Sequence, residues 1–167
     1  MTLSREDTRA AYDRHRKLHE AGHWGAIADL FAEDGRYSEP YFGELVGREA
    51  IRAFLVKSMA GLEAWTFPIE WTVVDEGRVV SHWQNRLPGT RRGGGHFEFP
   101  GISTITYDDH GMIARQVDFY DRMKVLQVVA EARSRVVEHA VAGIGRIGRS
   151  VVMGTHWLVA KTSAGVR

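Results

Sequence analysis

The sequence predicts an α+β domain in which a curved antiparallel sheet wraps around helices to form a cone. Apolar residues before residue 62 recur with the spacing of helices, whereas residues 65–120 alternate with period two and are rich in β-branched and aromatic side chains. Because helices precede strands without alternating with them, the order argues against a parallel sheet. The open end of such a cone is a natural pocket for a small molecule.

Local signals place three helices before the sheet. Ser4 and Asp7 form a capping-box pattern with an acid in the first turn, which begins the first helix. A stripe of apolar residues with helical spacing defines the second helix, which is expected to end at the turn residues 33–35. In order, the expected elements are a helix at 4–20, a helix at 23–32, short strands at 36–38 and 42–46, and a helix that opens at 47–49.

An antiparallel meander of four strands is expected next, followed by one more helix. Hairpin turns at residues 75–77 and 108–111 join pairs of strands, and a longer glycine-rich connection spans residues 88–94. The strands are expected at 65–74, 78–87, 95–107 and 112–120, and the helix at 121–142. We therefore expect one domain over residues 1–142 and a C-terminal extension over residues 143–167.

Composition and charge describe an ordinary globular protein of one domain. The 167 residues are 44% hydrophobic and 26% charged, and the formal net charge is +1. No overall basicity therefore predicts a nucleic-acid partner. Residues 133–167 nevertheless hold six Lys and Arg against one Glu. This basic extension suits a lid, a subunit contact or a flexible tail.

Several kinds of chemistry are not expected. The sequence holds no cysteine, which excludes disulfides, thiol nucleophiles and thiolate metal sites. His15 and His19 are the one pair of histidines at i,i+4 spacing within a single expected helix, and that helix is basic, so we expect no metal site and no cofactor. The N-terminus holds no apolar leader, and the chain holds no run of about 18 apolar residues. The expectation is a cytoplasmic protein with no membrane partner.

Three segments resemble one group of families. Residues 15–40, HRKLHEAGHWGAIADLFAEDGRYSEP, resemble the opening of bacterial ketosteroid isomerases and their nuclear-transport-factor-two-like relatives. Residues 100–113, PGISTITYDDHGMI, are typical of SnoaL-like sequences, and residues 116–121 resemble the last strand of SnoaL-like polyketide cyclases and of limonene epoxide hydrolase. The resemblance covers residues 5–135 and implies a cystatin-like α+β barrel with a hydrophobic pocket, whose sheet face often forms a homodimer.

The resemblance to ketosteroid isomerase implies three roles. The general-base aspartate of that enzyme falls on Glu39, and its oxyanion-donor tyrosine falls on His15. Its protonated oxyanion aspartate falls near Ser103. The base thus remains a carboxylic acid at Glu39, whereas the two oxyanion donors are replaced by other residue types at His15 and Ser103.

The resemblance to the hydrolase and the cyclases implies further positions. The water-holding tyrosine of limonene epoxide hydrolase falls on Tyr37 and its asparagine on Glu39. Its Asp-Arg-Asp set falls near Asn85, Trp83 and Asp118, so the arginine is missing and epoxide opening by that mechanism is not favoured. The base of the SnoaL-like cyclases falls again on Asp118, the position on which two of the comparisons agree.

Strand alternation decides which side chains accompany Asp118. Gln116, Asp118 and Tyr120 share one face of the last strand, and Val117 and Phe119 share the other. Periodicity alone would bury Val117 and Phe119 and leave Asp118 exposed. The resemblance instead points Asp118 into the cone and packs Val117 and Phe119 beneath the helices. A carboxylate in an apolar cone has a raised pKa and can act as base or acid near neutral pH.

These residues favour an acid–base enzyme of the cyclase or isomerase type that needs neither cofactor nor metal. Its expected partner is a small hydrophobic oxygenated molecule such as a polyketide, a terpenoid or a steroid-like compound. Asp118 is the expected principal base, with Glu39 or His15 as the second proton handler. The residues expected to bind substrate or water are Tyr37, Trp83, Asn85, Ser103 and Tyr120.

Two alternatives stay open beside this enzyme. One is a non-catalytic small-molecule-binding protein of the same fold, and the other is an epoxide hydrolase. A homodimeric interaction module is compatible with each of them.

Overall fold

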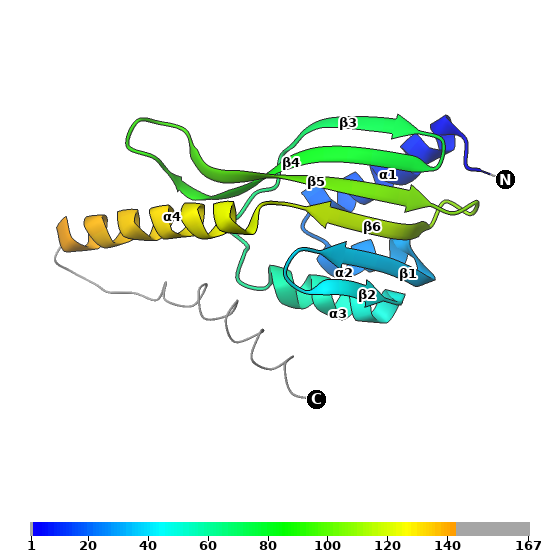
Figure 1. Cartoon of the computed structure of the whole chain (residues 1–167), viewed down its shortest axis with the longest axis horizontal. Coiled ribbons are helices and arrows are strands. Elements are labelled where there is room, and N and C mark those ends of the chain that lie inside the picture. The colour runs from blue at the N-terminus through cyan, green and yellow to red at the C-terminus, as the bar shows by residue number, and fades with distance from the viewer. Residues whose placement is uncertain (1, 143–167) are drawn as a thin grey trace. The chain divides into compact units, whose positions relative to one another are not determined.

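A computed structural model describes residues 2–142 of the chain (Figure 1). The chain divides into two compact units, Met1–Ala132 and Arg133–Arg167, and the fold described below is that of the first unit. The basic extension expected at residues 143–167 lies outside the described residues.

The described strands form one curved sheet in the order β2-β1-β6-β5-β4-β3. The last four strands in the chain make the expected antiparallel meander. The first two strands form an antiparallel hairpin that joins the sheet through a parallel pairing of β1 with β6. The bounds are β1 Phe31–Glu39, β2 Gly43–Val46, β3 Ile69–Asp75, β4 Arg78–Thr90, β5 His96–Tyr107 and β6 Ile113–Phe119. The predicted α+β fold with a curved sheet is confirmed.

The helices begin and end close to where local sequence signals place them. Ser4 is the N-cap of α1, and its Oγ accepts a hydrogen bond from the backbone N–H of Asp7 at 3.1 Å. Gly47 caps α3 with φ at 91°, a conformation that favours glycine. The helices are α1 Arg5–Glu20, α2 Trp24–Ile27 with a 3₁₀ turn at Ala28–Leu30, α3 Arg48–Met59 and α4 Arg122–Ala142.

The second helix is much shorter than predicted. The helix expected at 23–32 gives way at Phe31 to β1, and the expected turn at 33–35 lies inside that strand. Phe31 pairs with Ile113 of β6 and is 1% exposed, so sheet pairing and burial outweigh the helical spacing of the apolar residues. The register between β1 and β6 shifts between Phe31 and Arg36, and this irregularity takes up the acidic turn residues.

The main core lies between the helices and the inner face of the sheet. Helix α1 contacts β3 and β4, while α3 contacts β1 and β2 (Figure 1). The core cluster joins Tyr12 of α1 and Ile51 of α3 to Phe31, Ile105 and Ile113 of the sheet. Polar groups on this inner face are thereby removed from water.

A second apolar cluster forms where α4 meets the sheet. Val125 and Val128 of α4 pack against Leu87, Phe97 and Phe99 of β4 and β5. Trp65, Tyr41 and Tyr120 lie at the border of this cluster and are partly buried. The aromatic side chains gather at one end of the inner face, which positions them beside the polar residues described next.

The outer face of the sheet carries exposed apolar side chains. Phe119 of β6 is 54% exposed, so the expectation that Phe119 packs beneath the helices is wrong. The helices cover the opposite face, which is the face that bears Asp118. Alternation was correct about which residues share a face, and the resemblance was correct about the face of Asp118 but wrong about Phe119.

Candidate acid–base site

Asp118 lies on the inner face of β6, surrounded by neutral hydrogen-bond donors. Tyr37 Oη donates to Asp118 Oδ2 at 2.6 Å. Ser103 Oγ donates to Oδ1 at 2.6 Å, and Gln116 Nε2 donates to the same oxygen at 3.1 Å. Burial raises the pKa of Asp118, while the bonds from Ser103, Tyr37 and Gln116 oppose that rise.

Strand register explains why these donors meet. Ser103 of β5 stands directly opposite Asp118 in the antiparallel pairing with β6. Tyr37 of β1 stands beside Gln116 in the parallel pairing, one strand further along the sheet. Gln116 lies two residues before Asp118 and therefore shares its face. Three adjacent strands thus supply the surroundings of one carboxylate.

Glu39 forms a second pair with a tyrosine. Tyr120 Oη donates to Glu39 Oε2 at 2.5 Å, and Glu39 Oε1 accepts from the backbone N–H groups of Tyr41, at 2.9 Å, and Phe42. Glu39 is 7% exposed, so it is not the solvated acid that its place before Pro40 would suggest. Burial raises its pKa, the bond from Tyr120 lowers it, and the charge of Asp118 raises it further.

The two pairs act on each other electrostatically. Burial raises the pKa of Tyr37 well above its ordinary value, and the negative charges of Asp118 and Glu39 add to this effect. Burial also raises the pKa of Tyr120, and the same two carboxylates raise it further. Both phenols therefore stay protonated as donors, and the two carboxylates disfavour each other's ionised form.

Trp83 joins the site through Ser103. Its indole Nε1 donates to Ser103 Oγ at 2.8 Å. Its ring centroid lies 6.5 Å from that of Tyr120, with the planes at 66°. Trp83 therefore contacts a hydrogen-bond donor of each carboxylate: Ser103, which donates to Asp118, and Tyr120, which donates to Glu39.

His15 and Asn85 lie in the interior but are not hydrogen-bonded to either carboxylate among the described contacts. His15 stacks on Tyr12 with centroids 6.0 Å apart. Burial lowers the pKa of His15 to about 3, with a contribution from His19, so its ring is neutral near pH 7. His15 Nδ1 and Asn85 Nδ2 are buried and have no hydrogen-bond partner among the described residues. Each of these atoms therefore lacks the partner that a buried polar group normally has.

Some contributors were not predicted as site residues. Gln116 was placed on the face of Asp118 but was given no role, although its amide donates to that carboxylate. The backbone donors of Tyr41 and Phe42 to Glu39 were also missed. A polar side chain two residues from a candidate base on the same strand is the signal that could have found Gln116.

A groove of about 400 Å³ adjoins the site. Pro40 and Tyr120, which flank Glu39, are among its lining residues, together with Ile102 and Phe119 of the outer face. Neither Glu39 nor Asp118 is among its lining residues.

The described part of the chain shows neither a metal-binding cluster nor a membrane-spanning helix. Within residues 2–142, no group of three or more His, Cys, Asp or Glu side chains is arranged to hold a metal. No helix within that range is long and apolar enough to cross a bilayer.

A family model described as the SnoaL-like domain matches residues 12–116, and the chain therefore belongs to the SnoaL-like domain family. The match includes Tyr37, Glu39, Trp83 and Ser103 and ends two residues before Asp118. A comparison with curated protein sequences gave no match.

Solved structures share the fold at low sequence identity. A candidate ketosteroid isomerase from Kribbella flavida DSM 17836 is 21% identical, with a TM-score of 0.54 over 70% of this chain and 79% of that one. A candidate polyketide cyclase from Xanthomonas campestris pv. campestris is also 21% identical, with a TM-score of 0.58 over 74% and 98%. A protein of unknown function with a cystatin-like fold, from Methylobium petroleophilum PM1, is 17% identical, with a TM-score of 0.57 over 72% and 79%. These similarities establish the fold.

Proposed function

We propose that the protein is an acid–base enzyme of the cyclase or isomerase type, which moves a proton on a small hydrophobic oxygenated molecule without a cofactor or metal. The observation that carries the proposal is the presence of two carboxylate–tyrosine pairs on the buried face of the sheet. Tyr37 Oη lies 2.6 Å from Asp118 Oδ2, and Tyr120 Oη lies 2.5 Å from Glu39 Oε2. The names of two structural neighbours, a candidate isomerase and a candidate cyclase, agree with this class.

Mutual repulsion between the carboxylates supplies the division of labour that such chemistry needs. Burial raises the pKa of both groups, and the charge of Asp118 raises that of Glu39. When one group is ionised, the other therefore tends to keep its proton, so that one can act as base and the other as acid. Donors surround both carboxylates, but the charge of Asp118 raises the pKa of Glu39, and on this ground we propose Asp118 as the principal base.

His15 suits a different role from proton uptake. A ring whose pKa is lowered to about 3 is a weak base near neutral pH. Its neutral form can donate a hydrogen bond to an oxygen that becomes negative during the reaction. Asn85, whose Nδ2 is buried without a described partner, can donate to a second oxygen of the same molecule.

The apolar surroundings favour a ring-bearing substrate. Phe97, Phe99 and Trp65 gather beside Tyr120, the partner of Glu39. Aromatic walls with a few polar groups bind apolar molecules and orient them by their oxygen atoms. Polyketides, terpenoids and steroid-like ketones have this character, and we propose that the substrate is one of them.

A non-catalytic binding protein is the second candidate function, and one observation favours it. Asp118 accepts hydrogen bonds from Tyr37, Ser103 and Gln116, which is also what a purely structural buried carboxylate would require. A binding role would use the same face of the sheet and the same ligands without proton transfer.

Deuterium exchange next to a carbonyl separates the two functions. A steroid enone, a terpenoid ketone and a polyketide β-ketoester would be incubated with the protein in D₂O and followed by NMR. We expect catalysed exchange for at least one ligand, and Asp118→Asn should lower its rate by about 10²- to 10⁴-fold with little change in affinity.

Asp109→Asn, in an exposed turn, is the matched control and should exchange at the wild-type rate. Ligands that bind tightly but never exchange faster than in buffer would establish the binding protein instead.

A further inference from the structure

We propose that Trp83 is a positioning residue of this site, which holds the Ser103 hydroxyl in place as a donor to Asp118. The proposal rests on the acid–base role proposed above for Asp118. Its test measures the free protein and needs no turnover, so the two proposals can fail separately.

When Asp118 is ionised, the donors in the hydrogen-bond chain from Trp83 to Asp118 all point toward the carboxylate. Trp83 Nε1 lies 2.8 Å from Ser103 Oγ, and Ser103 Oγ lies 2.6 Å from Asp118 Oδ1. An indole N–H can donate but cannot accept, and a serine hydroxyl has a single proton. Ser103 Oγ accepts from Trp83 with one lone pair, which holds the hydroxyl in place with its single proton toward the ionised Asp118. The chain crosses three adjacent strands, β4, β5 and β6.

Gly101 is the reason that the indole can take this position. Gly101 of β5 stands opposite Trp83 of β4. A Cβ at Gly101 would lie 2.4, 2.5 and 2.7 Å from three carbon atoms of the indole ring, so the ring rests directly on the glycine backbone. A larger residue at this position would force the ring to move. The absence of a side chain at Gly101 thus lets Trp83 place its N–H at Ser103.

The expected consequence concerns the charge state of Asp118. Burial raises the pKa of Asp118, and among the hydrogen bonds that lower it the bond from Ser103 has the largest effect. Without the indole N–H, the Ser103 hydroxyl is free to turn its proton away from Asp118 and to accept a hydrogen bond from the neutral acid. The neutral form of Asp118 would then gain stability, and its pKa would rise.

Other groups around Asp118 remain in place when the indole N–H is removed. Tyr37 and Gln116 continue to donate to its carboxylate. The titratable neighbours whose charge or proton is coupled to it are Tyr37 and Glu39 of β1 and Tyr120 at the end of β6. A change caused by Trp83 must therefore be traced through Ser103, which the test below does.

The test is a carboxyl-carbon NMR titration of Asp118 in the full chain without ligand. Trp83→Phe keeps an aromatic ring over Gly101 but removes the N–H, and we expect the Asp118 pKa to rise by about one unit. Ser103→Ala should raise it at least as much. In the Ser103→Ala background, Trp83→Phe should add no further rise, because the residue through which it acts is gone.

Trp71→Phe is the matched control, since Trp71 lies on the outer face, stacked on His82 with centroids 5.1 Å apart, and should leave Asp118 unchanged. An Asp118 pKa unaffected by Trp83→Phe would overturn the proposal. So would an equal rise with and without Ser103, because that would mean that the ring acts by packing alone. A rise through Ser103 in a protein that never catalyses exchange would leave the positioning role intact and refute only the enzyme.

Discussion

His15 and His19 are the residues whose protonation differs most clearly between the folded protein and the unfolded chain. Both lie on α1, one turn apart, with ring centroids 6.2 Å from each other. Burial lowers the pKa of His15 to about 3 and that of His19 to about 4. In the unfolded chain both would titrate near 6.5. Below that pH the unfolded chain therefore binds protons at these two histidines that the folded protein does not bind.

Because of this difference, lowering the pH destabilises the folded protein. The stability that comes from two neutral histidines is complete above pH 6.5 and is lost as the pH falls toward 4. Each histidine removes about 1.4 kcal/mol of unfolding free energy per pH unit in that window. Glu39 and Asp118 act in the opposite sense, because their raised pKa values favour the folded state at low pH. We expect the free energy of unfolding of His15→Gln, measured with urea, to fall clearly less between pH 6.5 and 4.5 than that of the wild type.

His110→Gln serves as the control, because this side chain is 82% exposed in a turn. Its variant should lose stability with pH as the wild type does. Identical pH profiles for wild type and His15→Gln would show that His15 is not held neutral by burial.

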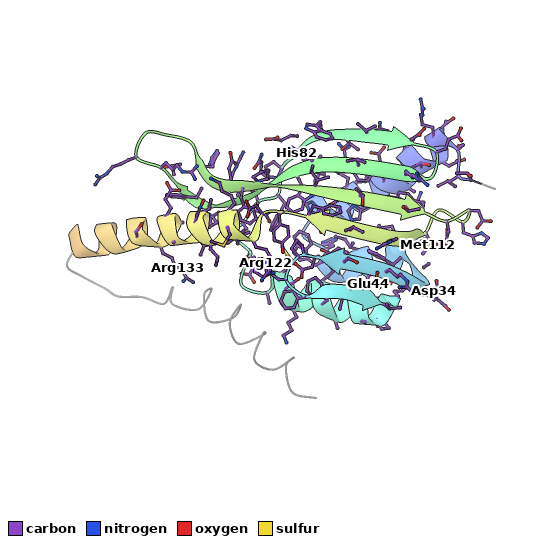
Figure 2. The ribbon with its side chains drawn as sticks, in the orientation of Figure 1. Asp34, Glu44, His82, Met112, Arg122 and Arg133 are labelled. Carbon is purple, nitrogen blue, oxygen red and sulfur yellow. The ribbon has the colours of Figure 1, made fainter. Side chains whose placement is uncertain are left out.

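At the scale of elements, α4 is held to the sheet by a narrow apolar contact. Val125 and Val128 are 6% and 1% exposed, whereas Leu126 between them is 57% exposed. Arg122, at the start of the helix (Figure 2), lies over the ring of Tyr41, with its guanidinium carbon 4.8 Å from the ring centroid. The first turns of the helix thus cover the aromatic residues beside Glu39 with one face and leave Leu126 exposed on the other.

Val128→Ala tests how much this contact stabilises the fold. Removing two buried methyl groups should lower the free energy of unfolding by about 2 kcal/mol, measured by urea denaturation. Leu126→Ala, on the exposed face of the same helix, should change it by less than about 0.5 kcal/mol. Equal effects of the two substitutions would mean that the docking of α4 does not contribute to stability.

At the scale of the whole molecule, one row of side chains crosses the outer face of the sheet. Trp71, His82, Ile102 and Phe119 stand opposite one another in successive strand pairings from β3 to β6. Figure 2 labels His82 within this face. Trp71, Ile102 and Phe119 are 48%, 36% and 54% exposed. Exposed apolar rows of this kind are unusual on the surface of a monomer.

The homodimer expected from the family resemblance is still a prediction, and this row is where we propose that it forms. Sedimentation of the wild type should give the mass of two chains, and Phe119→Lys together with Ile102→Lys should give the mass of one. Leu126→Lys, an equally exposed apolar position on α4, should leave the dimer intact. A wild type that sediments as a monomer at all concentrations would refute this prediction.

Much of this molecule follows from local sequence. The N-cap at Ser4, the helix after Gly47 and the four strands of the meander were all predicted, because caps, turns and alternation act between neighbouring residues. The prediction of a helix through Phe31 was wrong because it, too, relied on a local signal. The helical spacing of the apolar residues is that signal, and the pairing with Ile113 that outweighs it is a distant one.

The candidate site depends on contacts that no local pattern contains. The alternation in the last strand groups Asp118 with Gln116 and Tyr120 but does not say which face is buried. Tyr37 and Asp118 are 81 residues apart in the chain, and so are Glu39 and Tyr120. The sequence alone supplied the residue types and the faces that they share. Their pairing and their burial arise only when β1 joins β6 in parallel and the helices cover that face, because hydrogen bonds and desolvation depend on distance in space rather than along the chain.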